Sequence, residues 1–443
     1  MTLKSKMKDS GVEWIKDIPE NWDVQKVKYL VKDRLAYGAN ETGDDETLNG
    51  IRYIRITDID QSGNLQNNGG VYLERNKALN YLLEDGDILL ARSGATVGKS
   101  FLYNQKYGEA CFAGYLIRAR PESSKLLSRF FYYYTKSKPY FDFIALETIQ
   151  ATIQNVNGNK YNNLFVILPS TNEQEIIVEY LDNQCSLIDN QIILRNKLSR
   201  LLKEKRQALI NQTVTRGLDV KISLKPSEIE WIGDIPEHWK VNKIKFTSSV
   251  KGRIGWQGLR SDEFIEDGPY LITGTEFKSG TVLWKNCHHV EKWRYEQDPY
   301  IQIRKEDVLI TKDGTIGKVA YIKDIPGPTT LNAGVMVIRS TRNTYLPRFM
   351  FWVLQSDQFL QYVEYTKAGS TIKHLYQETF ENFAYAYPES HDEQKQIFEY
   401  LDTKIESIDN AILQLQKVTK LLRERKSTII SDGVTGKIQL RSN

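Results

Sequence analysis

The feature that most constrains this chain is an internal duplication that covers nearly all of its 443 residues. The segment SGVEWIKDIPENWDVQKVKYL at 10–30 returns as SEIEWIGDIPEHWKVNKIKFT at 227–247. Likewise, DILLARSGATVGK at 87–99 returns as DVLITKDGTIGK at 307–318, which is 220 positions later. A repeat of this length indicates the duplication of a domain, because solenoid repeats are only about 20–45 residues long. We therefore expect two equivalent halves, each folding as one unit.

The repeated glycine segment looks like a phosphate-binding loop but predicts a β-hairpin. The phosphate-binding pattern is G-x-x-x-x-G-K-[ST], in which the loop length sets where each backbone N–H points. Here Gly94 and Gly98 are separated by three residues. In the second copy Gly314 and Gly317 are separated by two, and Val319 stands where the serine would be. Both copies share an apolar run, a glycine turn and a second apolar run, which is typical of a hairpin.

Each half begins with a segment of mixed character that predicts an α+β domain. Strand-like runs in the first half are IRYIRITDI (51–59), DILLAR (87–92), CFAGYLIRAR (111–120) and LFVILP (164–169). Their counterparts in the second half are PYLIT (269–273), DVLITK (307–312), AGVMVIR (333–339) and FAYAYP (383–388). One helical stretch is expected before the last strand of each half, at 126–148 and 345–367.

Each half ends in a long predicted helix with a narrow apolar seam. The second seam alternates steps of four and three residues, as in a heptad repeat, and comprises Leu401, Ile405, Ile408, Ile412, Leu415, Leu422 and Ile429. The first seam comprises Leu181, Cys185, Ile188 and Ile192. It then breaks at Arg195 and Ser199, where Leu194, Leu198 and Leu201 are expected to move the stripe sideways before Leu202 and Leu209. Predicted capping boxes are Thr171 with Gln174 and Ser390 with Glu393.

A narrow apolar seam needs a partner, and the second copy in the same chain is the nearest one. If the halves are related by a pseudo-two-fold axis across the helix pair, the two helices run antiparallel and a domain lies at each end. The 39 residues from Glu173 to Asn211 would span about 58 Å. A rod of fixed length would suit a protein that holds two DNA-recognition surfaces at a set separation. The helical repeat of DNA is about 34–36 Å, and paired recognition surfaces use that distance to reach the same face of the duplex. The alternative is that these helices dimerise two copies of the chain.

These motifs together resemble the specificity subunit of type I restriction–modification systems. The resemblance rests on the WIKDIPENW and WIGDIPEHW openings, the Gly-Lys hairpin and a helix entry in which a proline precedes Glu-Gln, all present twice; three residues separate the proline from Glu-Gln in the first copy and four in the second. It implies two mixed target recognition domains, at 1–170 and 218–388, each reading half of a bipartite, asymmetric DNA site. It also implies spacer helices at 171–217 and 389–443, packed as an intramolecular antiparallel coiled coil that sets the spacing.

The resemblance further implies partners that carry the chemistry. Two modification subunits would dock on the coiled coil and methylate adenine at N6 with S-adenosylmethionine, and restriction subunits using ATP and Mg²⁺ would join in some complexes. The chain itself would bind double-stranded DNA and no cofactor. Three cysteines without paired spacing, Cys111, Cys185 and Cys287, fit the reducing cytoplasm. The beginning of the sequence lacks the apolar segment of a signal peptide, and no apolar run predicts a membrane span.

No catalytic motif is visible in the sequence. The nearest segment to an adenine methyltransferase loop, [DNS]PP[YFW], is Asp298-Pro299-Tyr300, which lacks one proline and has no counterpart in the first half. His288 and His289 beside Cys287 do not predict a metal site, because adjacent side chains point apart on regular backbone. The alternatives are a self-sufficient DNA methyltransferase or nuclease with fused readers, and a coiled-coil interaction protein unrelated to DNA.

Features shared by the halves are expected to be scaffold or phosphate contacts, whereas features that differ are candidates for base readout. The repeated tryptophan pairs, Trp14 with Trp22 and Trp231 with Trp239, are therefore read as anchors. A net charge of +4 permits DNA binding through local patches. Candidate hairpin residues are Arg92, Ser93, Lys99, Lys312, Asp313 and Lys318, of which the basic ones would contact phosphates.

Two further regions supply candidates for DNA contact. The loop before the last strand contributes Gln154 and Asn155 in the first half and Lys373 and His374 in the second. The segment 251–264 contributes Lys251, Arg253, Trp256, Gln257 and Arg260. Its counterpart at 32–46, at nearly the same distance from the tryptophan pair, contributes Arg34, Tyr37 and Asn40. For each of these residues a solvated hairpin tip or an ordinary polar loop is the alternative.

Overall fold

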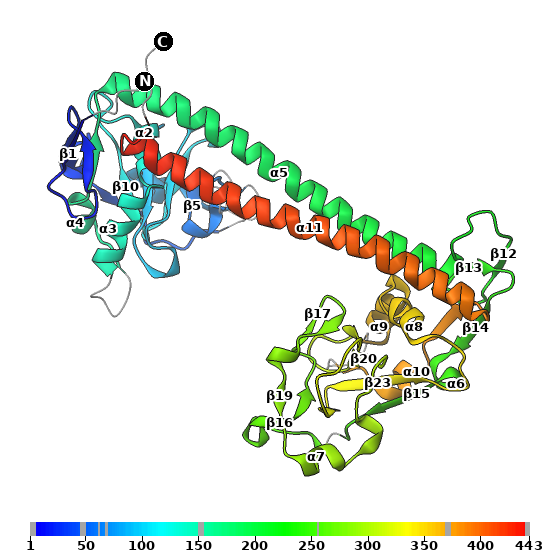
Figure 1. The fold of residues 1–443 in the computed structure, drawn as a ribbon. Helices are drawn as coiled ribbons and strands as arrows, with labels where there is room; N and C mark the ends of the chain where they lie inside the picture. Colours follow the sequence, from blue (N-terminus) through cyan, green and yellow to red (C-terminus); the bar gives the residue numbers. More distant parts are fainter. Residues whose placement is uncertain are drawn as a thin grey trace. The chain divides into compact units, whose positions relative to one another are not determined.

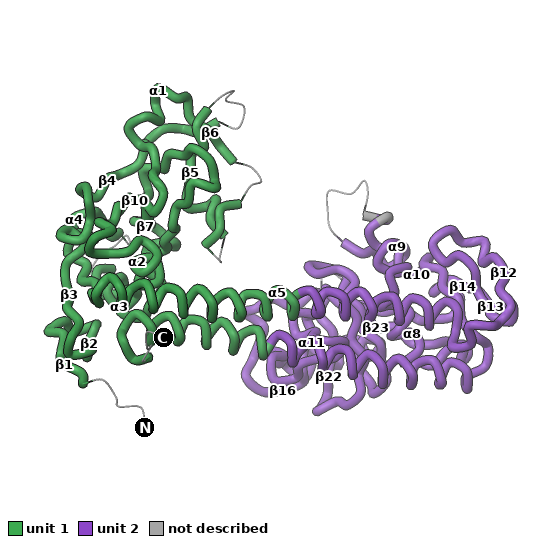
Figure 2. Tube along the Cα trace, turned by 90° about the horizontal axis from the view of Figure 1, so that it is seen from above, with its two compact units in different colours: residues 1–196, 417–443 green, residues 197–416 purple. Residues whose placement is uncertain are grey.

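The protein is described by a computed structural model that covers residues 6–44, 50–60, 63–66, 70–148, 155–254, 257–367 and 374–438. The chain divides into two compact units, residues 1–196 with 417–443 and residues 197–416 (Figure 2). Each unit contains one mixed domain and parts of both long helices, α5 (Thr171–Arg216) and α11 (His391–Val434). In the described part of the chain, no helix is long and apolar enough to cross a membrane.

The first unit is built around a four-stranded antiparallel sheet. Its order is β4 (Ala36–Tyr37), β10 (Leu116–Ala119), β7 (Ile88–Ala91) and β8 (Ser100–Leu102). A three-stranded sheet has the order β6 (Val71–Leu73), β5 (Ile51–Ile54) and β9 (Ala110–Phe112). Two pairs complete the unit, β11 (Phe165–Leu168) with β3 (Asp23–Lys26) and β1 (Met7–Asp9) with β2 (Asp17–Pro19).

The second unit repeats this topology. Its four-stranded sheet has the order β15 (Ser248–Gly252), β23 (Val335–Ser340), β20 (Val308–Thr311) and β21 (Val319–Tyr321). The other sheets are β19 (His288–His289), β16 (Ile265–Ile272) and β22 (Thr329–Leu331), then β14 (Lys240–Lys243) with β24 (Ala384–Tyr387), and β12 (Leu224–Pro226) with β13 (Asp234–Pro236). A short hairpin, β17 (Phe277–Lys278) with β18 (Thr281–Val282), is added. The predicted duplication and α+β class are confirmed.

The central strands are continuous apolar runs because both of their faces are covered. In β7, Ile88 and Leu90 enter one core, whereas Leu89 and Ala91 enter another. In β20, Val308 and Ile310 likewise belong to one core, and Leu309 lies in a second. Alternation along a strand sends successive side chains to opposite faces, so a run without polar residues indicates that each face is packed.

The single helix predicted in each half is in fact two helices. The first half has α2 (Ser128–Tyr134) and α3 (Lys138–Thr148), and the second has α8 (Pro347–Val353) and α9 (Asp357–Lys367). The break falls at a serine in both halves. Ser137 donates its hydroxyl to Tyr134 O at 2.6 Å, and Ser356 donates to Val353 O at 2.7 Å. These local bonds compete with the helical pattern, which explains why apolar periodicity alone did not reveal the turn.

The two long helices pack antiparallel in each unit (Figure 1). In the first unit, Leu181, Cys185 and Ile188 near the start of α5 share a core with Ile430 and Val434 near the end of α11. In the second unit, Ile210 and Val214 near the end of α5 share a core with Ile397, Leu401 and Ile405 near the start of α11. The predicted intramolecular antiparallel coiled coil is thereby confirmed.

Two details of the helix prediction are wrong. Leu194, Leu198 and Leu201 do not move the seam, because they are 64%, 47% and 47% exposed, while Arg195 and Ser199 are half-buried. The first cap is Ser170, whose hydroxyl accepts from Glu173 N at 3.3 Å, rather than Thr171. The second predicted cap is confirmed, since Glu393 N donates to Ser390 Oγ at 3.3 Å.

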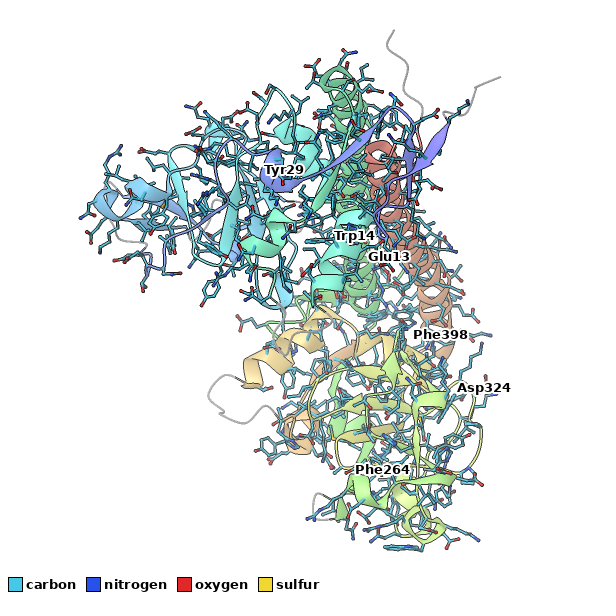
Figure 3. The ribbon with its side chains drawn as sticks, turned by 90° about the vertical axis from the view of Figure 1, so that its left-hand side faces the viewer. Glu13, Trp14, Tyr29, Phe264, Asp324 and Phe398 are labelled. Atoms are coloured by element: carbon cyan, nitrogen blue, oxygen red, sulfur yellow. The ribbon has the colours of Figure 1, made fainter. Side chains whose placement is uncertain are left out.

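Each mixed domain is fixed to its long helix by repeated side-chain contacts. The indole Nε1 of Trp22 donates to Glu173 Oε1 at 3.0 Å, and that of Trp239 donates to Glu393 Oε1 at 2.8 Å. The ring of Trp14, which is labelled in Figure 3, packs against Phe143 of α3, with centroids 5.7 Å apart. These contacts support the reading of the repeated tryptophans as structural anchors.

A second tie joins α2 and α8 to the helices. Arg129 donates through Nε to Asp182 at 2.8 Å, and Arg348 donates through Nε to Asp402 at 3.0 Å. Trp352 Nε1 adds a bond of 2.8 Å to Asp402. The first mixed domain is therefore tied to α5 through α2, and the second to α11 through α8.

Candidate nucleic-acid interface

In each unit, several loops meet at one end of the four-stranded sheet. In the first unit these are the β7–β8 turn, the residues after β4, the β9–β10 connection and the segment that begins at Asn155. Val156 N donates to Arg92 O at 2.8 Å, and Arg92 N donates to Tyr115 O at 3.1 Å. Ser93 forms an isolated bridge with Asn155. The structure thus brings together candidate residues from three regions that are far apart in the sequence.

The turns that form this sheet end are β-hairpins, as predicted. β7 pairs with β8 and β20 with β21, both antiparallel. Gly94 and Gly98 have φ of 71° and 80°, and Gly314 and Gly317 have φ of 66° and 82°. This left-handed region favours glycine because it has no Cβ. The glycines therefore shape the turn, which accounts for their repetition.

Arg92 and Tyr37 form the centre of the first cluster. The guanidinium carbon of Arg92 lies 5.1 Å from the centroid of the Tyr37 ring. The Tyr37 hydroxyl accepts a hydrogen bond of 2.8 Å from Gly158 N, which fixes the ring. The Nε of Arg92 is buried and has no hydrogen-bond partner among the described residues. Tyr115, beside them, is 67% exposed.

The second unit places different side chains on the same framework. Leu375 N donates to Lys312 O at 2.9 Å, and Lys312 N donates to Gly334 O at 2.8 Å. The exposed carboxylate of Asp313 is hydrogen-bonded to the imidazole of His374. This cluster therefore presents an anchored acceptor, whereas the first cluster presents a guanidinium.

The segment 257–260 reaches the same sheet end in the second unit. Asn332, just before β23, accepts from Leu259 N at 2.9 Å through Oδ1 and donates to Leu259 O at 3.1 Å through Nδ2. Gln257 is half-buried and Arg260 is exposed on either side of this contact. The predicted third region is thus adjacent to the hairpin turn.

Other predicted residues lie at the surface or hold loops together. Lys99 donates to Ile59 O at 2.7 Å, so its ammonium stabilises a neighbouring loop. Lys251 lies over the ring of Tyr300, with Nζ 5.8 Å from the centroid. Arg34, Asn40 and Lys318 are exposed. Gln154, Trp256 and Lys373 fall outside the residues that the structure describes.

The prediction that Arg253 contacts DNA is wrong. Its side chain is 0% exposed. It donates to Leu331 O at 2.8 Å, Thr330 Oγ1 at 3.1 Å and Gln297 Oε1 at 3.1 Å. Burial lowers the pKa of this guanidinium from its usual value. Arg253 is therefore a cross-link inside the second domain, which composition alone could not distinguish from a surface arginine.

Strand register corrects the comparison between 32–46 and 251–264. Ile117 pairs with both Tyr37 and Leu90, whereas Met336 pairs with both Gly252 and Ile310. Tyr37 is therefore equivalent to Gly252. Counting residues from the tryptophans gave the wrong alignment of the two halves. In the second half β15 pairs continuously over Ser248–Gly252, whereas in the first half the chain leaves the sheet between Val31 and β4.

The same register reveals a residue that the sequence analysis missed. Tyr115 precedes Leu116, which pairs with Ala91, and Gly334 precedes Val335, which pairs with Thr311. An exposed tyrosine in one half thus corresponds to a glycine in the other. A difference of this kind is the signal of a candidate reader, but a correct alignment of the halves was needed to find it.

The chemistry at these sheet ends is that of donors and acceptors. Burial raises the pKa values of Cys111 and Cys287 to about 12, so neither thiol is a ready nucleophile at neutral pH. The carboxylate of Asp298, in the segment closest to a methyltransferase loop, accepts from Tyr300 N at 2.9 Å and caps a short helix. No group of three or more His, Cys, Asp or Glu residues in the described ranges is arranged to hold a metal ion.

Comparison with known proteins places these features in context. The model of the family described as "Type I restriction modification DNA specificity domain" matches residues 19–203 and 236–419. The specificity subunit of the type I restriction enzyme MjaVIII from Methanocaldococcus jannaschii is 23% identical over 435 residues, which cover 96% of this chain and 95% of that protein. That of EcoBI from Escherichia coli is 22% identical over 386 residues, covering 84% and 78%.

Solved structures share the fold. A chain from a structure of a type I R-M system superposes with a TM-score of 0.71 at 14% identity, covering 95% of this chain and 99% of that chain. The HsdS subunit from Thermoanaerobacter tengcongensis gives a TM-score of 0.53 at 15% identity, covering 95% and 98%.

Proposed function

This chain belongs to the type I restriction–modification DNA specificity family, and from that membership we propose how its two halves divide the reading of DNA. It is a specificity subunit with two DNA specificity domains. Each domain reads one half of a bipartite, asymmetric DNA site through the loops at the end of its four-stranded sheet. The helices α5 and α11 set the distance between the half-sites.

The observation that carries this proposal is that the two domains share the same backbone hydrogen bonding at the sheet end but present different side chains there. The backbone bond from Val156 to Arg92 has its equivalent in the bond from Leu375 to Lys312. On that shared framework, Ser93 is replaced by Asp313 and Asn155 by His374. Side chains that differ on a conserved backbone are what two readers of different base sequences require.

We propose that the modification subunits dock on the exposed face of the long helices. Leu187, Leu194, Leu198 and Leu201 on α5 are each 47–64% exposed. Their spacing of seven, four and three residues puts them on one face of the helix. Aliphatic side chains gathered on one exposed helix face indicate a surface that another protein covers. The charged segments 202–207 and 422–427 would border this contact.

The chain performs no chemistry itself under this proposal. S-adenosylmethionine binds to the modification subunit, which methylates adenine at N6, and ATP with Mg²⁺ belongs to a restriction subunit where one joins. The support is that burial raises the pKa values of Cys111 and Cys287 to about 12, well above neutral pH, and that Asp298 is engaged in a helix cap.

The test is a methylation assay with and without the partner. The full chain alone should transfer no methyl group to DNA, and addition of its modification subunit should give methylation at one bipartite sequence. Transfer by the purified chain alone would show that it is a self-sufficient methyltransferase. Methylation without a sequence requirement would refute the reading role.

Docking is tested separately by co-purification with the modification subunit. Leu194→Gln together with Leu198→Gln should weaken the complex at least tenfold while leaving the melting temperature nearly unchanged, because both side chains are exposed. Gln414→Ala, on an exposed position of α11, is the control. If the double variant assembles as well as the wild type, the modification subunits dock on a different surface.

A further inference from the structure

We propose that Arg92, stacked on Tyr37, selects a guanine in the half-site read by the first domain. This inference rests on the proposed function, since it names a base that one of the two readers recognises. Guanine presents O6 and N7 as adjacent acceptors in the major groove, and a guanidinium bonds both at once. Among the residues of the second domain that the structure describes, no arginine is stacked on a tyrosine at the equivalent positions, which are Lys312 and Gly252.

The geometry holds the guanidinium ready before DNA arrives. The backbone of Arg92 is fixed on both sides, by its N–H to Tyr115 O at 3.1 Å and by Val156 N to its carbonyl at 2.8 Å. The Tyr37 ring lies 5.1 Å from the guanidinium carbon and is itself held by Gly158 N. A side chain already confined in this way loses less conformational freedom on binding.

Arg92 keeps donors unused, as Arg118 of the same unit also does at its buried Nε, whereas several other arginines of the unit are paired. Arg75, Arg120 and Arg129 are paired with Glu109, Asp87 and Asp182. Arg92 makes no ion pair within the described residues, and its buried Nε has no acceptor. A buried donor that is left unpaired is unfavourable, and an acceptor that reaches it would relieve that cost.

The second half provides an internal comparison. Lys312 occupies the position of Arg92, and Gly252 occupies the position of Tyr37, so neither the planar fork nor the ring is present. A lysine ammonium is a compact charge that suits a phosphate, whereas the planar guanidinium offers parallel donors. If Arg92 contacted only a phosphate, nothing would require the tyrosine platform or the orphan Nε.

The experiment is methylation of a random DNA library by the full chain with its modification subunit, followed by sequencing of the methylated sites. The wild type should require a guanine in one half-site. Arg92→Gln and Arg92→Lys should reduce discrimination for that guanine roughly 5- to 150-fold, with the other half-site unchanged. Tyr37→Leu should give a smaller loss in the same direction. Arg75→Gln, which removes one charge from the same domain, is the control.

The outcomes separate this inference from the proposed function. An unchanged guanine preference in the Arg92 variants, or a wild-type half-site without guanine, would overturn the inference. Uniformly weaker binding to all sequences, with a salt dependence reduced by about one ion, would assign Arg92 to a phosphate and also overturn it. If the wild-type complex methylates without any sequence preference, the proposed function itself fails. Thermal melting of each variant verifies that the domain is folded.

Discussion

The ammonium of Lys426 lies 2.7 Å from both carboxylate oxygens of Asp189 and joins α11 to α5. The duplication repeats this ion pair with the roles of the helices exchanged. In the second pair the base is on α5 and the acid on α11, where Arg206 Nε donates to Asp409 at 2.9 Å. Asp409 is 220 positions after Asp189, and Lys426 is 220 positions after Arg206. Each helix therefore carries the acid in its first half and the base in its second half, and antiparallel packing brings these opposite charges together.

Charge reversal across this pair should show specific coupling. Asp189→Lys places two cations together and should destabilise the first unit by about 0.5–1 kcal/mol. Adding Lys426→Asp should recover most of that loss, because the opposite charges are restored with their positions exchanged. Urea unfolding of the wild type, both single variants and the double variant measures the coupling. Purely additive effects would contradict a direct contact.

The buried glutamine at the start of each long helix should matter more than these ion pairs. Gln394 is 0% exposed, accepts from Leu346 N at 2.7 Å, and donates to Pro388 O at 2.8 Å and Thr344 O at 3.2 Å. Gln394→Ala should cost about 2–4 kcal/mol of unfolding free energy, because three backbone groups lose their partner. Urea unfolding followed by tryptophan fluorescence measures the change. Gln414→Ala is the matched exposed control, and an equally small effect in both would refute this role.

Duplication made the fold largely predictable from the sequence. Two copies of every strand pattern and of the heptad seam indicated two α+β domains and an antiparallel helix pair. The break in the domain helix and the first helix cap were not predicted, because they depend on local side-chain bonds that have no periodicity. Ser137 and Ser356 end a helix through their own hydroxyls, and Ser170 takes the cap from Thr171.

The candidate site was predictable only in part. Comparison of the halves found the hairpin turn and the loop that follows α3 or α9, which the structure brings together at Asn155 and His374. It failed for Arg253 because the residue type does not reveal burial. It missed Tyr115 because the equivalence of Tyr115 and Gly334 follows from strand pairing.

Lys136 should make the stability of the first unit depend on pH. Burial lowers its pKa from 10.5 to about 8, and its ammonium donates to Ser100 O at 2.9 Å. Below about pH 8 the folded protein carries the full cost of the buried charge, whereas between pH 8 and 10.5 the unfolded chain binds more protons. Stability should therefore rise with pH in that window, by up to about 3 kcal/mol, and less where water reaches the ammonium.

Gln355 is the residue of the second half that corresponds to Lys136. Lys136→Gln should therefore be tolerated, should stabilise the first unit at pH 7, and should flatten the rise of stability with pH. Urea unfolding at intervals from pH 7 to 10 measures both effects. The matched control is Lys28→Gln. Lys28 is exposed, and its Nζ lies 4.8 Å from the centroid of a tyrosine ring, as does that of Lys136. Equal slopes for wild type and Lys136→Gln would show that Lys136 does not titrate in this range.

Asp313 should govern base preference in the second half-site alone. Its carboxylate contacts His374, and the backbone of the neighbouring Lys312 is bound to Gly334 and Leu375, so every contact lies within the second unit. A carboxylate accepts from cytosine N4, whereas an amide pairs with adenine through a donor and an acceptor. Asp313→Asn should thus shift one position of the second half-site from cytosine toward adenine, as measured by sequencing of methylated DNA. Ser93→Ala, at the equivalent position, should leave that half-site unchanged. A shift in both half-sites would contradict independent readers.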